Sequence, residues 1–215
     1  MNHPAKLSSL AEALAFTAFV GLYIWRLQAQ APRFWWVIAV WLGVSVLLRR
    51  DSPKTLGWRA DNLWSSARQA FPFFAVASLS ICAAGLFLGM LHRLPVHLLD
   101  ARKFANYLAF CLLQQVALNS FVTNRFLTYF DRAWPSAALA GLLFAALHWP
   151  NPVLVPLTLI GGGAMAWLFA KDRNILPLAL GQALLGALIW WAFPVAWHHS
   201  MRVGPGFYTY HPSKP

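Results

Sequence analysis

The chain has 215 residues, of which 59% are hydrophobic and only 11% are charged, and it contains 12 Trp and 16 Phe. This composition excludes an ordinary soluble domain and indicates an integral membrane protein. The formal net charge of +11 does not indicate nucleic-acid binding, because the Lys and Arg residues fall at the ends of apolar runs. Cys82 and Cys111 lie inside apolar segments, so neither a disulfide framework nor a zinc pattern is predicted.

Apolar runs of about 20 residues can each cross a hydrocarbon core. We predict one all-α domain over residues 1–215, a bundle of about seven transmembrane helices with limits of about six and eight. Two N-terminal spans fall within residues 10–48, and residues 49–70 form a cytoplasmic loop with a short interfacial helix. The later spans are expected at about residues 71–91, 104–127, 134–149, 153–170 and 175–197, and the tail after His198 is expected to be peripheral.

The distribution of cations predicts the orientation of the bundle. Ten of the 17 Lys and Arg residues fall on the side that holds Lys6, the loop from Arg49 to Arg68, Lys171 and Arg173. Cytoplasmic loops carry an excess of Lys and Arg, so the N-terminus is expected in the cytoplasm. We read the first apolar run, which includes Glu12, as a span and not as a removable signal peptide.

Amide side chains recur on one face of the fourth expected span. Gln114 and Gln115 are adjacent, and steps of four residues from Gln115 bring Asn119 and Thr123 onto the same helical face. Amides within a membrane can be interhelical contacts worth about 0.6–2 kcal/mol each, or they can line a cavity. The sequence leaves both interpretations open, and Gln182 in the last span is a candidate partner.

Other polar or small residues at membrane depth allow a structural explanation. His148 follows a short helix, where an interfacial histidine would be stabilised by the helix dipole. The glycines 161–163 most simply permit close approach of neighbouring helices. The single Glu, Glu12, and the five Asp residues all lie away from His148, so neither a proton relay nor a catalytic metal site is predicted, and no cofactor is expected. Ser120 is the nearest candidate for a nucleophile paired with His148, but no neighbouring residue in the sequence supports that role.

Three segments in this order, QQVALNSFVTNRFL, FAALHWPNP and LTLIGGGAMAWLFAKDRNILPLALGQALLG, resemble the CPBP family of CAAX proteases and bacteriocin-processing proteins, also called Abi. The resemblance covers residues 104–186, and the loop segment DSPKTLGWR is similar to the family's entry to its core. It implies an all-helical, CAAX-protease-like core and an intramembrane endopeptidase ancestry.

The family's site motifs are only partly present. One family helix carries Glu-Glu with an Arg four residues after the second Glu, the next carries Phe and then His four residues later, and the last carries His and then Asn four residues later. The matching positions here are Gln114, Gln115 and Asn119, then Phe144 and His148, then Gln182 and Gly186. In an alternative register Arg125 is the family's Arg, and Ser120 and Phe121 take the acidic positions. Neither register contains a glutamate.

The resemblance implies that a glutamate activates water in the family, and an amide cannot accept that proton. We therefore expect a catalytically degenerate homologue that binds a membrane peptide or scaffolds a partner, with His148, Gln114, Gln115, Asn119 and Gln182 lining one cavity. Two alternatives stay open: an active intramembrane endopeptidase that processes prenylated or C-terminally tagged peptides, and a subunit of a membrane complex or transporter. The expected partners are membrane lipids and a membrane peptide or protein. Family resemblance suggests a bacterial inner membrane, and the oligomeric state is not specified by the sequence.

Overall fold

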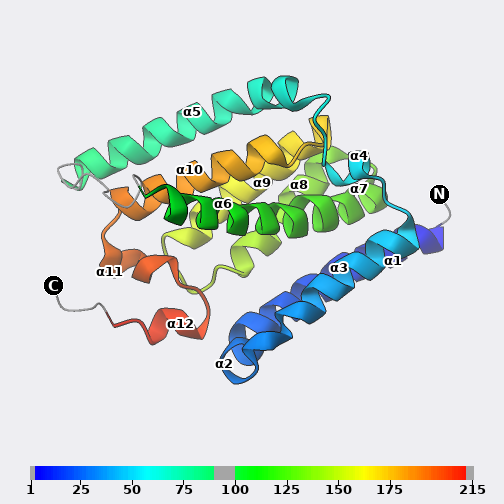
Figure 1. Cartoon of the computed structure of the whole chain (residues 1–215), viewed down its shortest axis with the longest axis horizontal. Helices are drawn as coiled ribbons and strands as arrows, with labels where there is room; N and C mark the ends of the chain where they lie inside the picture. The colour runs from blue at the N-terminus through cyan, green and yellow to red at the C-terminus, as the bar shows by residue number, and fades with distance from the viewer. Residues whose placement is uncertain (1–2, 90–99, 212–215) are drawn as a thin grey trace.

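The computed structural model describes residues 3–89 and 100–211 (Figure 1). The described residues form helices joined by turns, with no strand, which confirms the prediction of an all-α fold. The long helices are α1 (His3–Leu22), α3 (Trp35–Arg49), α5 (Leu63–Phe87), α6 (Ala101–Gln115), α7 (Asn124–Phe130), α8 (Ala133–Ala146), α9 (Leu154–Asp172) and α10 (Leu176–Ala192). The short ones are α2 (Gln28–Gln30), α4 (Pro53–Leu56), α11 (Val195–His198) and α12 (Pro205–Tyr208).

Two stretches of π-helix lie inside longer helical segments. Tyr23–Leu27 continues α1 into α2, and Val116–Thr123 joins α6 to α7 without a turn. Helix α6, the second π-helical stretch and α7 therefore form one continuous segment that carries the glutamines. In a π-helix the backbone pairs i with i+5, and such stretches frequently occur at functional sites.

Within the described part of the chain, four helical segments are long and apolar enough to cross a membrane. They are Pro4–Gln30, Pro32–Arg49, Leu63–Phe87 and Leu154–Asp172. Helices α8 and α10 are also apolar but shorter. Helix α6, which carries the glutamines, is less apolar because it also contains Arg102, Lys103 and Asn106. Gln115 is fully buried within this bundle, where a polar side chain needs a partner.

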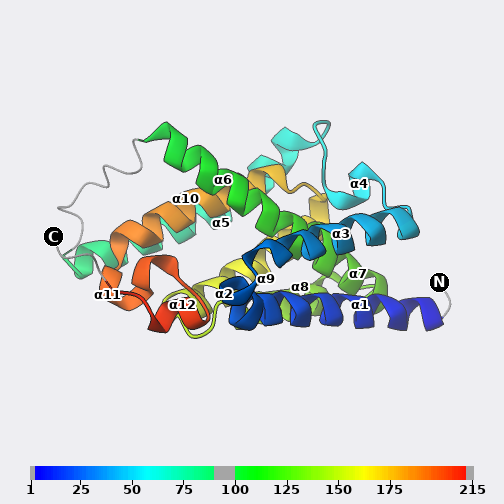
Figure 2. The ribbon, with the colours of Figure 1, turned by 60° about the horizontal axis from the view of Figure 1, so that its bottom comes forward.

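The bundle consists of an N-terminal hairpin beside a core. Figures 1 and 2 show α1 and α3 side by side as a hairpin, with the segment from α6 to α7 between this hairpin and the pair formed by α5 and α10. Helices α8 and α9 make the most extensive helix pair in the described residues. A buried aromatic cluster joins hairpin and core, where the Phe16 and Phe121 rings lie 4.6 Å apart between centroids.

The segment DSPKTLGWR docks on the core through its backbone. Gly57 has a positive φ of 82°, and a Cβ there would lie 2.6 Å from the Phe169 ring, so only glycine fits. The Gly57 carbonyl accepts a hydrogen bond from Ile175 N at 3.0 Å, and the Leu56 carbonyl accepts one from Ser120 Oγ at 2.5 Å. The loop therefore fixes the start of α10 relative to the π-helical segment.

The structure differs from the expected elements at two places. The residues from Leu63 onward belong to α5 and do not form a separate interfacial helix. The short helix within residues 49–70 is α4. Helix α10 ends at Ala192 instead of continuing to Trp197, because Pro194 lacks the backbone N–H that a continued helix requires. The connection expected between the spans at 71–91 and 104–127 falls mostly on residues 92–99, outside the described residues.

An ion cluster of Glu12, Arg49, Asp51 and Arg125 fastens the hairpin to the core. Glu12 accepts from Arg49 Nε at 2.7 Å and from Arg125 Nε at 3.1 Å, while Arg125 Nη2 donates to Asp51 at 2.7 Å. The Ser45 hydroxyl also donates to Glu12. Only 3% of the Arg125 side chain is exposed, so both carboxylates compensate a buried guanidinium.

Candidate functional site

A continuous chain of side-chain hydrogen bonds links α6, the π-helical stretch Val116–Thr123 and α10. Gln182 Nε2 donates to Gln114 Oε1 at 2.6 Å, and Gln115 Nε2 donates to Gln182 Oε1 at 2.7 Å. Asn119 Nδ2 then donates to Gln115 Oε1 at 2.5 Å, and Thr123 Oγ1 donates to Asn119 Oδ1 at 3.0 Å. The amide partners expected for Gln182 are thus Gln114 and Gln115. We call Gln114, Gln115, Asn119 and Gln182 the amide chain.

The amide chain divides into buried and cavity-facing members. Gln115 and Asn119 are fully buried, and Gln115 Nε2 also approaches Met165 Sδ at 3.2 Å. Gln114 and Gln182 instead line a cavity of about 170 Å³. Of the amides expected to share one cavity, two therefore form its wall, while the other two lie behind that wall and hold it in place.

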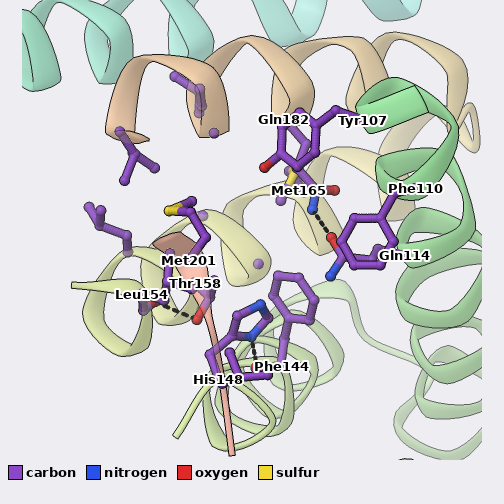
Figure 3. Close-up of a pocket in the computed structure, with 17 residues that line it drawn as sticks. Tyr107, Phe110, Gln114, Phe144, His148, Leu154, Thr158, Met165, Gln182 and Met201 are labelled. Carbon is purple, nitrogen blue, oxygen red and sulfur yellow. Dashed lines mark hydrogen bonds between the residues drawn. The ribbon is translucent and has the colours of Figure 1, made fainter. Parts of the chain in front are cut away.

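His148 lies on the opposite side of this cavity, which we call the amide cavity. Its Nδ1 lies 2.7 Å from the Phe144 carbonyl, and its ring packs edge-on against the Phe144 ring with centroids 4.6 Å apart. Because a carbonyl only accepts, Nδ1 carries the proton in the neutral imidazole, and Nε2 is left as an acceptor. Figure 3 shows Gln114, Gln182 and His148 around the same space.

Sequence reasoning missed much of the lining of the amide cavity, including its two hydroxyl groups, on Tyr107 and Thr158, and Met201. Tyr107 precedes Gln114 by seven residues, a spacing that places both on one helical face and that was available in the sequence. A Cβ on Gly186 would overlap the Tyr107 hydroxyl and lie 2.9 Å from its Cζ. Tyr107 therefore fills the space of a side chain at the position that aligns with the family's Asn.

The glycines 161–163 fulfil the expected packing role in part. A Cβ on Gly162 would lie 2.8 Å from the Phe144 ring, and Gly163 N would lie 2.7 Å from a Cβ on Gly141. Gly141 on α8 and Gly162 on α9 therefore permit the close approach of these two helices. Gly161 has open space around a built Cβ and lines the amide cavity, so it differs from its neighbours.

The residues after α10 form one end of the amide cavity, which corrects the expectation of a peripheral tail. Asn151 Nδ2 donates to the carbonyls of His198 at 2.8 Å and Arg202 at 2.9 Å, and Asn151 is fully buried. The Gly204 amide donates to the Trp149 carbonyl at 2.9 Å. Met201 and Val203, held by these bonds, line the cavity.

The imidazole of His198 helps to hold the same segment. Its Nδ1 accepts from Met201 N at 3.2 Å, and its Nε2 lies 3.2 Å from the Phe193 carbonyl. Both contacts require the neutral tautomer with its proton on Nε2. Burial lowers the pKa of His198, and hydrogen bonds to backbone carbonyls oppose that shift only in part.

The alternative register places its residues away from the cavity. Arg125 belongs to the ion cluster, Phe121 is 1% exposed in the core, and Ser120 binds the Leu56 carbonyl. None of the three lines the amide cavity. The geometry therefore favours the register in which Gln114 and Gln115 take the acidic positions. Glu12 lies in the ion cluster and not in this lining.

The side chains present limit the chemistry of the cavity. Among the described residues that line it, none is Asp, Glu, Lys or Arg. In the same part of the chain, no group of three His, Cys, Asp or Glu side chains is arranged to hold a metal ion. The wall consists of amides, one imidazole, two hydroxyls and apolar groups, which can donate and accept hydrogen bonds without charge.

The model of the Rce1-like family, described as type II CAAX prenyl endopeptidase Rce1-like, matches residues 104–188. This match supports membership of the core in the CPBP family of CAAX-protease-like membrane proteins. The match begins in α6 and ends in α10, so it contains the whole amide chain and His148. Neither the curated proteins nor the solved structures include a match to the chain.

Proposed function

We propose that the chain is a catalytically degenerate CPBP-type membrane protein that binds a membrane peptide in the amide cavity without cleaving it. One observation carries this proposal: Gln114 and Gln182 face the cavity and bond to each other at 2.6 Å, at positions that align with an acid and a histidine of the family. Gln182 Nε2 donates to Gln114 Oε1, so this bond needs no charged group, and no described lining residue is a carboxylate.

The chemistry of the amide group argues against peptide hydrolysis at these positions. A general base must take a proton from water, and an amide oxygen cannot hold that proton at neutral pH. Loss of general acid or base assistance costs roughly 100-fold to 10,000-fold in rate. An amide does, however, match the donor and acceptor groups of a peptide backbone, so binding does not need the missing acids.

The main alternative is an active endopeptidase that uses His148. This alternative is supported by the free Nε2 of His148, which makes no hydrogen bond among the described residues and faces the cavity. A neutral imidazole with an accessible lone pair is the usual general base in proteins. Under this alternative His148 would activate water without a carboxylate partner.

Binding and cleavage can be separated in one experiment. Purified protein in nanodiscs is incubated with synthetic single-span peptides that carry a photoreactive leucine, and mass spectrometry detects both cross-links and new peptide termini. We expect cross-links to α6 or α10 without new termini, and we expect Gln182→Leu to weaken them. Gln30→Leu is the matched control, because Gln30 is exposed and outside the cavity lining. Cleavage that His148→Ala abolishes would overturn the proposal in favour of the protease.

We also propose a bacterial inner membrane with the N-terminus in the cytoplasm. Support comes from cations that meet at one end of the bundle: Arg49 and Arg125 in the ion cluster, and Arg59, which donates to the Asp172 carbonyl beside Arg173. An excess of cations at one membrane face is typical of the cytoplasmic side. We expect a membrane-impermeant maleimide to label the variant Lys54→Cys only after cell lysis. Labelling of Lys54→Cys in intact cells would show the opposite orientation.

A further inference from the structure

A second cavity lies between the N-terminal hairpin and the core. It has a volume of about 450 Å³, and its walls include Phe16 and Ala39 from the hairpin and Ala117 and Leu143 from the core. We call it the hairpin groove. Its lining is mostly aliphatic and aromatic, as expected for a site that takes an apolar ligand.

The hairpin groove and the amide cavity share part of their walls. Phe110, Gln114, Phe144, His148 and Val203 line both. The two spaces are therefore adjacent at these five side chains, which places the polar end of the amide cavity beside the groove. An apolar compartment that opens onto a small polar one fits an amphiphile, with its chain in the first and its polar group in the second.

The polar atoms at this junction define the group that they can bind. Gln114 Oε1 already accepts from Gln182, while Gln114 Nε2 makes no hydrogen bond among the described residues. His148 Nδ1 is engaged by the Phe144 carbonyl, so its Nε2 remains an acceptor. Figure 3 shows the free nitrogen of Gln114 directed toward the side of Phe144 and His148. The junction thus offers one donor and one acceptor.

A charged polar group does not suit this junction. None of the described residues that line either cavity is Lys, Arg, Asp or Glu. A buried charge without a counter-charge or full hydration is strongly unfavourable. A carboxylate or phosphate would also only accept hydrogen bonds, and it would face the lone pair of His148 Nε2. A hydroxyl or an amide, by contrast, donates and accepts at once.

The size of the hairpin groove favours a single chain over a whole helix as its occupant. One turn of α-helix with side chains is about 10 Å wide and 5.4 Å long and takes up roughly 400 Å³. The groove, at about 450 Å³, has room for about one such turn, whereas a spanning segment needs about 20 residues. A single flexible aliphatic chain can follow the groove within this volume.

We propose that the hairpin groove and the amide cavity together bind a single-chain amphiphile with an uncharged hydroxyl or amide group, which sits between Gln114 Nε2 and His148 Nε2. The aliphatic chain lies between the N-terminal hairpin and the core. This ligand is a small neutral lipid and not the membrane peptide proposed above. It depends on the walls of both cavities and on the two free nitrogens, so it can be tested without a peptide.

The test uses four photoreactive probes that share one C16 chain and differ only in the head: alcohol, primary amide, sulfate and trimethylammonium. Protein in nanodiscs is irradiated with each probe, and labelled residues are mapped by mass spectrometry. We expect the alcohol and the amide to label groove residues at least about tenfold more than either charged probe. Equal labelling by all four heads, or labelling confined to the outer faces of the helices, would overturn the proposal.

Two substitutions on the same helix provide matched variants. Ala39 and Val40 are adjacent and exposed on α3, but only Ala39 lines the groove. Ala39→Trp fills the groove and is expected to reduce labelling by about tenfold, whereas Val40→Trp leaves it unchanged. Gln114→Leu should lower labelling by the alcohol and the amide but not by the charged probes. Failure of Ala39→Trp to reduce labelling refutes the groove site.

The outcomes also separate this inference from the proposed function. Cross-linking of membrane peptides to α6 or α10 with no head-group selectivity among the probes refutes the amphiphile site and leaves peptide binding intact. Selective labelling by the alcohol and amide probes without peptide cross-links supports the amphiphile site and refutes the proposed binding of a membrane peptide. Competition between the alcohol probe and a peptide would show that both enter the junction of Gln114 and His148.

Discussion

The hydroxyl of Tyr107 on α6 occupies the space in which a side chain at Gly186 on α10 would begin. A Cβ on Gly186 would also lie 2.9 Å from Tyr107 Cζ and 3.0 Å from its Cε1, so the aromatic ring itself blocks that position. The family pattern places an Asn there. At this position the chain has no amide, and a ring from the neighbouring helix occupies the space.

Gly186→Asn is expected to destabilise the protein by roughly 1–3 kcal/mol, because the new side chain overlaps a packed ring. Thermal unfolding in detergent measures the effect. Gly161→Asn is the matched control, since a Cβ on Gly161 meets nothing within 4 Å. Tyr107→Ala should recover part of the loss in the Gly186→Asn background, and equal unfolding temperatures for both glycine variants would contradict the prediction.

Gln115→Leu is expected to destabilise the bundle more than Gln114→Leu. Gln115 is fully buried and bonds to both Gln182 and Asn119, so its loss leaves buried amide atoms without partners at a cost of about 1–3 kcal/mol each. Gln114 loses one bond, and its partner Gln182 faces a cavity. Denaturation of the two purified variants in the same detergent measures the difference, and the reverse order would argue against the amide chain as described.

Arg125→Met should remove the ion pairs that Arg125 forms between the hairpin and the core. The substitution removes the buried guanidinium that pairs with Asp51 and with Glu12, and Glu12 keeps only Arg49. Breaking a buried ion pair costs about 3–5 kcal/mol. The exposed Arg132 provides the control substitution Arg132→Met. Limited proteolysis and unfolding temperature report the loss; similar behaviour of both variants would mean that the ion cluster contributes little.

Docking of the C-terminal segment is expected to weaken as pH falls. The pKa of His198 is lowered in the folded state from its ordinary value of 6.5, so the unfolded segment binds the proton more readily. The stabilisation is present above about pH 6.5 and is lost as pH decreases toward the lower folded pKa. Protonation of Nδ1 also removes the acceptor for Met201 N.

Hydrogen exchange of the Met201 and Gly204 amides tests this dependence. The ratio of their protection between pH 7.5 and pH 5 should be large in the native protein and small in His198→Asn, which cannot titrate. Both samples share the intrinsic pH dependence of exchange, so the comparison isolates the imidazole. An identical ratio in the variant would assign the pH response to another group.

Local spacing was sufficient to predict that Gln115, Asn119 and Thr123 share a helical face, and it made Gln182 on α10 a candidate partner. Steps of four residues relate Gln115, Asn119 and Thr123, and the amide of Gln182 required a partner at membrane depth. The same type of pattern, a step of seven residues, contained Tyr107 as well. The end of α10 was also readable from Pro194.

Other features depend on contacts that spacing cannot specify. The position of Met201 and Val203 follows from Asn151, which bonds to carbonyls about fifty residues away in sequence. The choice between the two registers needed the location of Arg125 in the ion cluster. The hairpin groove was hidden because lipid-facing and groove-facing apolar residues are chemically alike in a sequence.

The π-helical stretch Val116–Thr123 has a consequence for how this chain is compared with its relatives. A π-helix holds an additional residue in its widened turn, and each residue turns a helix by about 100°. Deletion of one residue there would rotate Arg125 by about that angle relative to Gln114 and Gln115. Insertions and deletions, more than substitutions, would therefore uncouple the two polar clusters. If the other chain has an uninterrupted α-helix here, an alignment without gaps across this stretch assigns residues to the wrong helical face.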